Sequence, residues 1–181
     1  MSKERGAPSP RWLNAGEKEA WVGLLHLLVE LPQALDRQLR AEAGLGHVYY
    51  AILATCSARP QRTCGLSDLA RSTGTSLSRL SHAVDALEER GLLARCRTAD
   101  SARPRVRLTD EGMALLEEIA PSHVEEVRRL VFDRLDPEEV RALAHLTAKL
   151  APGIRSAVDR PSPHSDPAVP PEPGAGDDAS R

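Results

Sequence analysis

The sequence predicts a mainly α-helical fold with one small β-hairpin. Apolar residues recur at helical spacing along most of the chain, and helix-start signals stand before several of these runs. One arginine-rich stretch instead alternates apolar and polar residues, which is typical of strands. A length of 181 residues suits one domain with some surplus at the ends.

The first element is a long helix that begins near Ala15. Asn14 and Glu17 have the spacing of a capping box, in which each side chain satisfies a backbone donor of the other residue. Two apolar stripes follow, so we expect one stripe to pack on its own domain and the other on a second subunit. Proline removes a backbone donor, so Pro32 is expected to kink this helix. The stripes are Trp21, Leu24, Leu28, Leu31 and Leu35, and Val22, Leu25 and Val29.

Three shorter helices follow the glycines at 44 and 46. The first is expected over 47–57, and a turn over 58–65 leads to a second helix that Ser67 caps and that ends near Ser72. A tight polar turn over 72–75 precedes a third helix, capped by Ser76 and stopped by Gly91. The last two helices and their turn form a helix–turn–helix.

The helix after Ser76 has an apolar face and a polar face. Leu77, Leu80, Val84 and Leu87 share the first, and Ser78, Arg79, Ser81, His82 and Asp85 share the second. A helix of this kind, held by another that crosses it, fits the major groove of DNA. The DNA-contact candidates on it are Ser76, Ser78, Arg79, Ser81 and His82. By itself, the polar face is better explained by solvation.

Two short strands, at 92–98 and 104–108, predict a β-hairpin with a polar tip between them. Residues 95–107 contain five arginines against one acid, Asp100, although the whole chain has a net charge of −2. Such a hairpin suits a phosphate backbone or a narrow minor groove, and its bland alternative is an edge kept soluble by charge. The candidates are Arg95, Arg97, Arg103 and Arg105. Helix and hairpin together favour DNA binding.

Two further helices and a tail complete the chain. Thr109 caps a helix that is expected to bend at Pro121 and to run to about Arg134. Asp136 and Pro137 begin a last helix, which carries Val140, Leu143, Leu146 and Leu150. Residues 152–181 hold seven of the fourteen prolines and few large apolar side chains, so we expect them to be disordered.

From about Trp12 to Leu150 the sequence resembles the MarR family of regulators. The resemblance is specific only when its segments are taken together. The matching segments are Trp12–Leu13, Gly44–Leu45 before Tyr49–Tyr50, Ser67–Ala70, Ser76–His82, Leu87–Leu92 and Leu108–Gly112.

The resemblance implies a winged helix–turn–helix lobe joined to a helical dimerisation region. Its boundaries would be a flexible N-terminus over 1–11, a MarR-type domain over 12–151 and a disordered tail over 152–181. Within the domain, 12–43 and 109–151 would form the dimerisation helices, and 44–108 the DNA-binding lobe. Members of the family are usually homodimeric repressors that bind pseudo-palindromic operators in double-stranded DNA. Many release DNA when a small aromatic or phenolic effector binds.

The hairpin departs from the family pattern at one position. The family wing commonly has an aspartate, one further residue and then an arginine that enters the minor groove. Here Asp100 is followed by Ser101 and Ala102, so Ala102 stands in the arginine position and Arg103 comes one place late. We expect Arg103 or Arg105 to substitute, since Pro104 stiffens the turn; weaker wing contacts are the alternative.

The effector pocket of the family would lie near the junction of the two regions. Trp21, His47, Tyr49 and Tyr50 are the candidate lining residues, although core packing also explains them. Cys96 lies between two arginines that could stabilise a thiolate, with a small packed strand residue as the alternative. Cys56 and Cys64 are assigned no chemistry.

The sequence also argues against several classes of function. The histidines show no metal-ligand spacing, and no nucleophile elbow, P-loop or dinucleotide fingerprint is present, so we expect no metal, no cofactor and no enzyme activity. No apolar run is long enough to span a membrane and the first residues lack a signal core, which favours the cytoplasm. The alternative function is a helical dimer whose winged lobe binds another protein rather than DNA.

Overall fold

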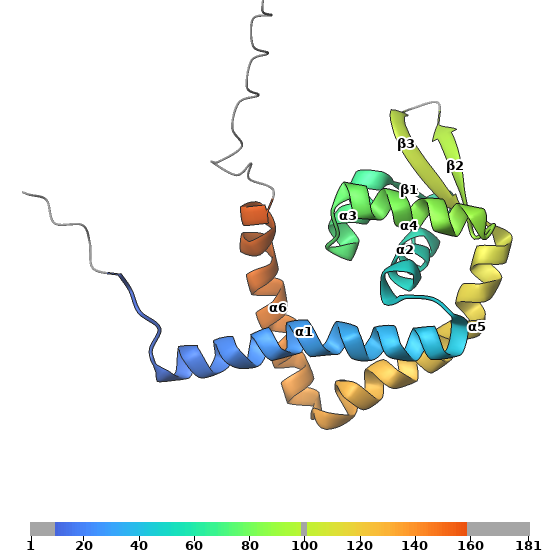
Figure 1. The fold of residues 1–181 in the computed structure, drawn as a ribbon. Helices are drawn as coiled ribbons and strands as arrows, with labels where there is room; N and C mark the ends of the chain where they lie inside the picture. The colour runs from blue at the N-terminus through green and yellow to red at the C-terminus, as the bar shows by residue number, and fades with distance from the viewer. Residues whose placement is uncertain (1–9, 99–100, 159–181) are drawn as a thin grey trace, which may run out of the picture. The chain divides into compact units, whose positions relative to one another are not determined.

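A computed structural model describes residues 10–98 and 101–158 of the chain. Residues 1–9, Asp100 and residues 159–181, where the sequence predicts flexible ends and part of the hairpin tip, lie outside the described residues. The described chain divides into one unit that ends at Arg134 and another that begins at Leu135. Figure 1 shows the elements, which are α1 (Ala15–Ala43), α2 (His47–Ser57), the 3-10 turn η1 (Pro60–Arg62), β1 (Thr63–Gly65), α3 (Leu66–Thr73), α4 (Leu77–Glu89), β2 (Leu93–Thr98), β3 (Ser101–Leu108), α5 (Asp110–Leu130), the 3-10 turn η2 (Phe132–Arg134) and α6 (Pro137–Val158).

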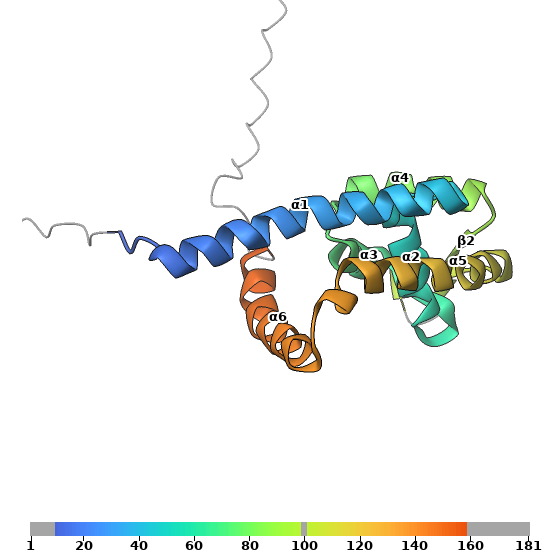
Figure 2. The same cartoon turned by 90° about the horizontal axis from the view of Figure 1, so that it is seen from below.

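Helix α1 has the predicted start and end. The Asn14 side chain accepts from the Glu17 amide at 2.9 Å, and the Glu17 carboxylate accepts from the Asn14 amide at 2.8 Å, which confirms the capping box. The helix continues through Pro32 and ends at Gly44, whose φ of 60° suits glycine. Its second half packs against α2 and α5 (Figure 2). Leu35 and Leu39 are buried in this half.

The core of the first unit lies between helices α2–α5 and a small antiparallel sheet. The strand order is β1–β3–β2, so the hairpin strand β3 is central. The largest fully buried side chains are Leu39, Leu45, Ile52, Leu53, Cys56, Leu69, Leu80, Val84, Leu87, Leu93 and Val106. This core holds α4 by one face and leaves its other face outside.

Two local predictions in this unit are wrong. Leu77 was expected on the buried face of α4, but it is 58% exposed, because α4 enters the core only at Leu80 and residues 77–79 lie outside it. Ser67 was expected to cap α3, yet the cap is Gly65 and no side chain bonds to it. The reason is strand β1, which the sequence did not indicate: it pairs with β3 up to Gly65, so α3 starts directly from an extended chain.

Helix α5 is joined firmly to the hairpin. The Thr109 hydroxyl accepts from the Gly112 amide at 2.9 Å and donates to the Gly91 carbonyl at 2.7 Å, so the predicted cap also bonds the end of α4. A Cβ on Gly112 would lie 2.7 Å from Leu108 Cδ1 and closer still to the Leu92 carbonyl oxygen. Only glycine therefore allows this close packing of α5 on the wing.

The second unit contains helix α6. The Asp136 carboxylate accepts from the Glu138 and Glu139 amides at 2.7 and 2.9 Å, which confirms the predicted start. The helix continues to Val158, so the disorder expected from residue 152 is wrong for residues 152–158. The physical reason is that Ile154 and Val158 continue the helical spacing of Leu146 and Leu150 past Pro152.

Candidate nucleic-acid interface

The outer face of α4 carries the polar side chains that the sequence singles out. Ser76, Ser78, Arg79 and His82 are exposed there, and Ser81 is partly buried. The Ser76 hydroxyl accepts from the Arg79 amide at 3.3 Å, so this serine is the N-cap of the helix. The side chains are thus presented from a helix end whose backbone is fixed by its own first residue.

Arg79 is the leading cation of this face. Among the described residues, it has no ion-pair partner, while Leu80 beside it is fully buried and anchors the turn. A guanidinium with free donors on a rigid helix can make two parallel bonds to a guanine edge or a phosphate. The geometry therefore suits recognition of an anionic polymer.

The wing strand residue Arg95 has a different environment from the other candidates. Its Nε donates to Glu88 Oε2 at 3.0 Å, its backbone amide donates to Glu88 Oε1 at 3.0 Å, and its Nη2 pairs with Asp85. The hydrogen bond to Asp85 is the main cause that raises the pKa of Arg95. The sequence places the two acids one helical turn apart, but it does not indicate that the wing folds back on them.

Arg105 and Arg107 of β3 lie on the other face of the hairpin from Arg95. Arg105 pairs with Cys96 across β2 and β3, and its Nη2 donates to the Thr63 carbonyl at 3.4 Å. Its buried Nε has no partner among the described residues. Arg107 is exposed and lines a depression of about 580 Å³ beside the Arg62–Asp110 ion pair. The side chains of Arg97 and Arg103, and of Ala102, lie outside the described part of the molecule.

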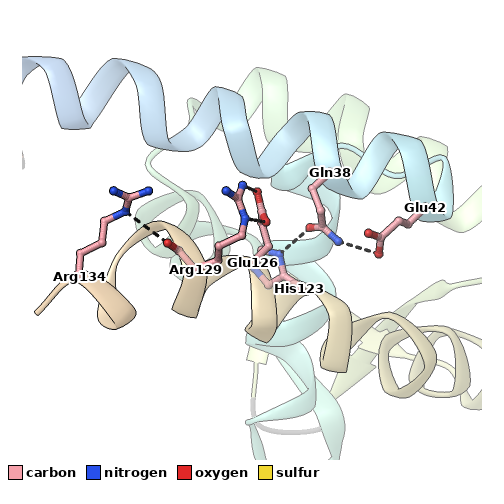
Figure 3. A network of polar contacts seen from close by, with 6 residues as sticks. All are labelled: Gln38, Glu42, His123, Glu126, Arg129 and Arg134. Atoms are coloured by element: carbon pink, nitrogen blue, oxygen red, sulfur yellow. Dashed lines mark hydrogen bonds and ion pairs between the residues drawn. The ribbon is translucent and has the colours of Figure 1, made fainter.

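Two of the four candidate effector residues meet at a buried histidine that the sequence did not single out. His123 of α5 is 7% exposed, and its ring centroid lies 4.2 Å from that of Tyr50 and 6.0 Å from that of His47. Its Nδ1 lies 3.3 Å from Gln38 Oε1 of α1 (Figure 3). Only the long-range packing of α1, α2 and α5 creates this cluster, so no local signal could have revealed it.

Burial controls the protonation of this cluster. It lowers the pKa of His47 and of His123, and it raises the pKa of Tyr50. Nearby carboxylates oppose the change: Asp36, which accepts from the His47 amide at 2.8 Å, and Glu126 and Glu42 near His123. The net result in each histidine is a preference for the neutral ring.

A shallow groove opens beside the cluster. It has a volume of about 490 Å³ and is lined by residues of α1 and α2: Pro32, Gln33, Asp36, Arg37, Arg40, His47 and Val48. Tyr49 packs at the edge of the core. Trp21 lines a separate depression with Leu13 and Leu24, and it stands roughly 22 Å along α1 from Asp36. Within one protomer, the structure therefore does not bring Trp21 to the other three candidates.

The cysteines show no reactive environment in the described residues. Cys56 and Cys64 are buried, and burial raises the pKa of Cys56. Cys96 is partly buried, and its neighbour Arg95 is already paired with two acids, so that arginine is not free to stabilise a thiolate. Over residues 10–98 and 101–158, no group of three or more potential metal ligands comes together, and no helix is both long and apolar enough to cross a membrane.

Comparison with known proteins places this geometry among transcriptional regulators. No family model matches the chain. One similar structure is that of Sco3205, a MarR family transcriptional regulator from Streptomyces coelicolor, in complex with DNA. Its sequence is 38% identical to this one and the TM-score is 0.75; the match covers 86% of this chain and 95% of that chain. AbsC, a MarR family transcriptional regulator from the same organism, is 32% identical with a TM-score of 0.74, over 81% and 99% of the two chains.

A more distant structure shares the fold alone. BpsR of Bordetella bronchiseptica, whose DNA binding is regulated by 6-hydroxynicotinic acid, is 24% identical with a TM-score of 0.58. The match covers 71% of this chain and 98% of that one.

Proposed function

The chain belongs to the MarR family of transcriptional regulators, and on that premise we propose that it is a homodimeric, sequence-specific repressor of transcription. The observation that carries the proposal is the outer face of α4. There, Arg79 and His82 are exposed on a helix that is capped by Ser76 and anchored by a buried face. A helix with these features is suited to the major groove of duplex DNA.

Each part of the lobe has a role in this proposal. Arg79 donates to a guanine edge or to a phosphate, and Ser78, Ser81 and His82 contact bases or backbone beside it. Arg97, Arg103 or Arg105 of the wing supplies the positive charge for the flanking minor groove, in place of the arginine absent at Ala102. Two lobes related by a dyad then require half-sites roughly 34 Å apart and hence a pseudo-palindromic operator.

The dimer follows from apolar surface that one protomer leaves uncovered. In the first half of α1, Trp21, Leu27, Leu28 and Val29 are 49–63% exposed, and on α6, Leu146, Leu150 and Ile154 are 53–58% exposed. A monomeric protein rarely leaves whole helix faces of this kind in water. We propose that a second copy of the chain covers both faces.

Effector control is proposed at the groove beside His47. The exposed Arg37 offers a cation there, and the imidazole of His47 offers a flat polar surface. A small aromatic or phenolic effector, above all one with an acidic group, suits this combination. Binding would release DNA if the ligand prefers a dimer whose lobes have the wrong spacing.

The decisive experiment measures DNA binding by fluorescence anisotropy. Duplexes that tile the region upstream of the gene are mixed with wild-type protein at two salt concentrations, with scrambled competitor DNA. We expect one duplex to bind tightly and to weaken steeply with salt, because phosphate contacts release counterions. The Arg79→Ala variant should lose about 1–3 kcal/mol of binding free energy and relax sequence preference, whereas Arg128→Ala on α5 should not.

Two outcomes would contradict the proposal. Unchanged affinity of Arg79→Ala for the selected duplex would remove this residue from DNA recognition. Two results with wild-type protein would instead favour a winged lobe that binds another protein. One is DNA binding without salt dependence, and the other is binding to a whole-genome pool of duplexes that is no tighter than binding to scrambled DNA.

A further inference from the structure

Arg95 links the wing to the recognition helix through its backbone amide and two of its guanidinium nitrogens. Its backbone amide and its Nε both donate to the Glu88 carboxylate, at 3.0 Å each, and its Nη2 pairs with Asp85. Asp85 and Glu88 are one turn apart on α4, so their carboxylates face the same way. A single arginine of β2 therefore spans two acids of the helix, and one contact involves the strand backbone itself.

We propose that Arg95 is a positioning residue, which fixes the angle of the wing against α4 so that wing and helix contact DNA together. This inference rests on the proposed function but assigns Arg95 a role other than the direct DNA contact that its position in a basic hairpin suggests. Carboxylates already hold Nε and Nη2 of the guanidinium group, so these two donors are not available for a phosphate in this arrangement.

Energetics favours orientation over stability as the role of the network. Arg95, Asp85 and Glu88 are all about half exposed, and exposed ion pairs contribute little to folding. Acidic side chains beside a DNA-binding surface also repel phosphates. Asp85 and Glu88 should therefore weaken DNA binding unless they hold in place a part of the protein that DNA binding requires.

The first test asks whether removing one acidic side chain of α4 weakens or strengthens DNA binding. Glu88→Ala and Glu89→Ala take the same charge from adjacent positions of α4, but Glu89 is exposed and has no partner among the described residues. The probe is a duplex that the wild-type protein selects from a random-sequence pool. We expect Glu88→Ala to weaken binding roughly three- to tenfold, and Glu89→Ala to leave it unchanged or to strengthen it. Equal effects of the two variants would overturn the proposal.

The second test separates positioning from direct contact. Lysine replaces arginine well at a phosphate but cannot bridge two carboxylates with a planar fork, so Arg95→Lys should lose nearly as much affinity as Arg95→Ala. Neither variant should change the slope of affinity against salt, and Arg95→Ala should cost no further affinity in a Glu88→Ala background. A near-wild-type Arg95→Lys together with a salt slope reduced by about one for Arg95→Ala would overturn the proposal.

A third measurement does not need DNA. Hydrogen–deuterium exchange of β2 amides, Arg95 included, should accelerate in Glu88→Ala and in Asp85→Ala but not in Glu89→Ala, because the first two lose contacts that hold the strand to α4. Thermal melting identifies any variant that fails to fold, and Asp85→Ala then replaces Glu88→Ala. If wild-type protein binds no DNA, the proposed function fails; if it binds DNA but exchange is unaffected in both variants, the role of Arg95 fails.

Discussion

His123 is surrounded by groups from three helices, and its protonation should affect the stability of the whole lobe. His47 and Tyr50 face it from α2. Gln38 and Glu42 lie near it on α1, and Glu126 on its own helix (Figure 3). The Gln38 amide donates to Glu42 Oε2 at 2.8 Å, so the acceptor near His123 is itself oriented. The cluster is built for a neutral imidazole, since burial outweighs the nearby carboxylates and lowers the pKa of His123.

We predict that the free energy of unfolding decreases as the pH falls from about 7.5 to about 5. The pKa values of His47 and His123 are lowered in the folded protein, so the unfolded chain takes up protons first as the pH falls, and this favours unfolding. Urea denaturation at several pH values measures the slope. His123→Gln should flatten it, and His82→Gln, which removes an exposed histidine of α4, should not. An unchanged slope in His123→Gln would contradict this account.

At the scale of the element, the N-cap of α4 should contribute to the stability of the protein, although residues 77–79 beside it are exposed. Ser76→Ala removes the acceptor of the Arg79 amide and should lower the free energy of unfolding by about 0.5–2 kcal/mol. Ser76→Asp retains a cap and should keep stability, yet it should weaken DNA binding because it adds a negative charge to the proposed interface. Chemical denaturation and anisotropy measure the two effects. Ser78→Ala is the control. If it loses as much stability as Ser76→Ala, the loss in Ser76→Ala does not come from the N-cap hydrogen bond.

Helix boundaries were largely predictable, whereas contacts between elements were not. Asn14, Ser76, Thr109 and Asp136 act on backbone groups within three residues of themselves, so their caps are visible in the sequence. Strand β1 exists only because β3 pairs with it, and it moved the start of α3 to Leu66. A three-residue strand offers no periodic pattern that could announce it.

The candidate site divides in the same way. The exposed polar face of α4 follows from its helical spacing, which is why Ser78, Arg79 and His82 could be named in advance. The ion pairs of Arg95 and the cluster around His123 join residues of different elements, and the charge or aromaticity of one residue does not identify its distant partner. The sequence therefore indicates Arg95 only as one DNA-contact candidate among the hairpin arginines, and it does not indicate His123 as part of the effector pocket.

At the scale of the whole molecule, assembly should depend on the uncovered apolar faces. Leu28→Glu on α1 and Leu146→Glu on α6 each place a charge in the proposed interface, twice in a two-fold dimer. We expect the dimer dissociation constant to rise by about a hundredfold or more, because an unpaired charge is costly to bury. Sedimentation velocity measures this at several protein concentrations. Leu77→Glu, at an equally exposed leucine of α4, should leave the dimer intact; dimers that persist in both interface variants would exclude these faces.

Helix α5 gives the lobe a mechanical property of its own. At one end, Gly112 lies directly against the Leu92 carbonyl at the base of the hairpin, and about 16 Å further along the axis His123 touches α1 and α2. The same rod therefore meets the hairpin and the groove neighbour His47. We expect a small rotation of α5 near His123 to move the hairpin as well, because Gly112 packs directly against the Leu92 carbonyl.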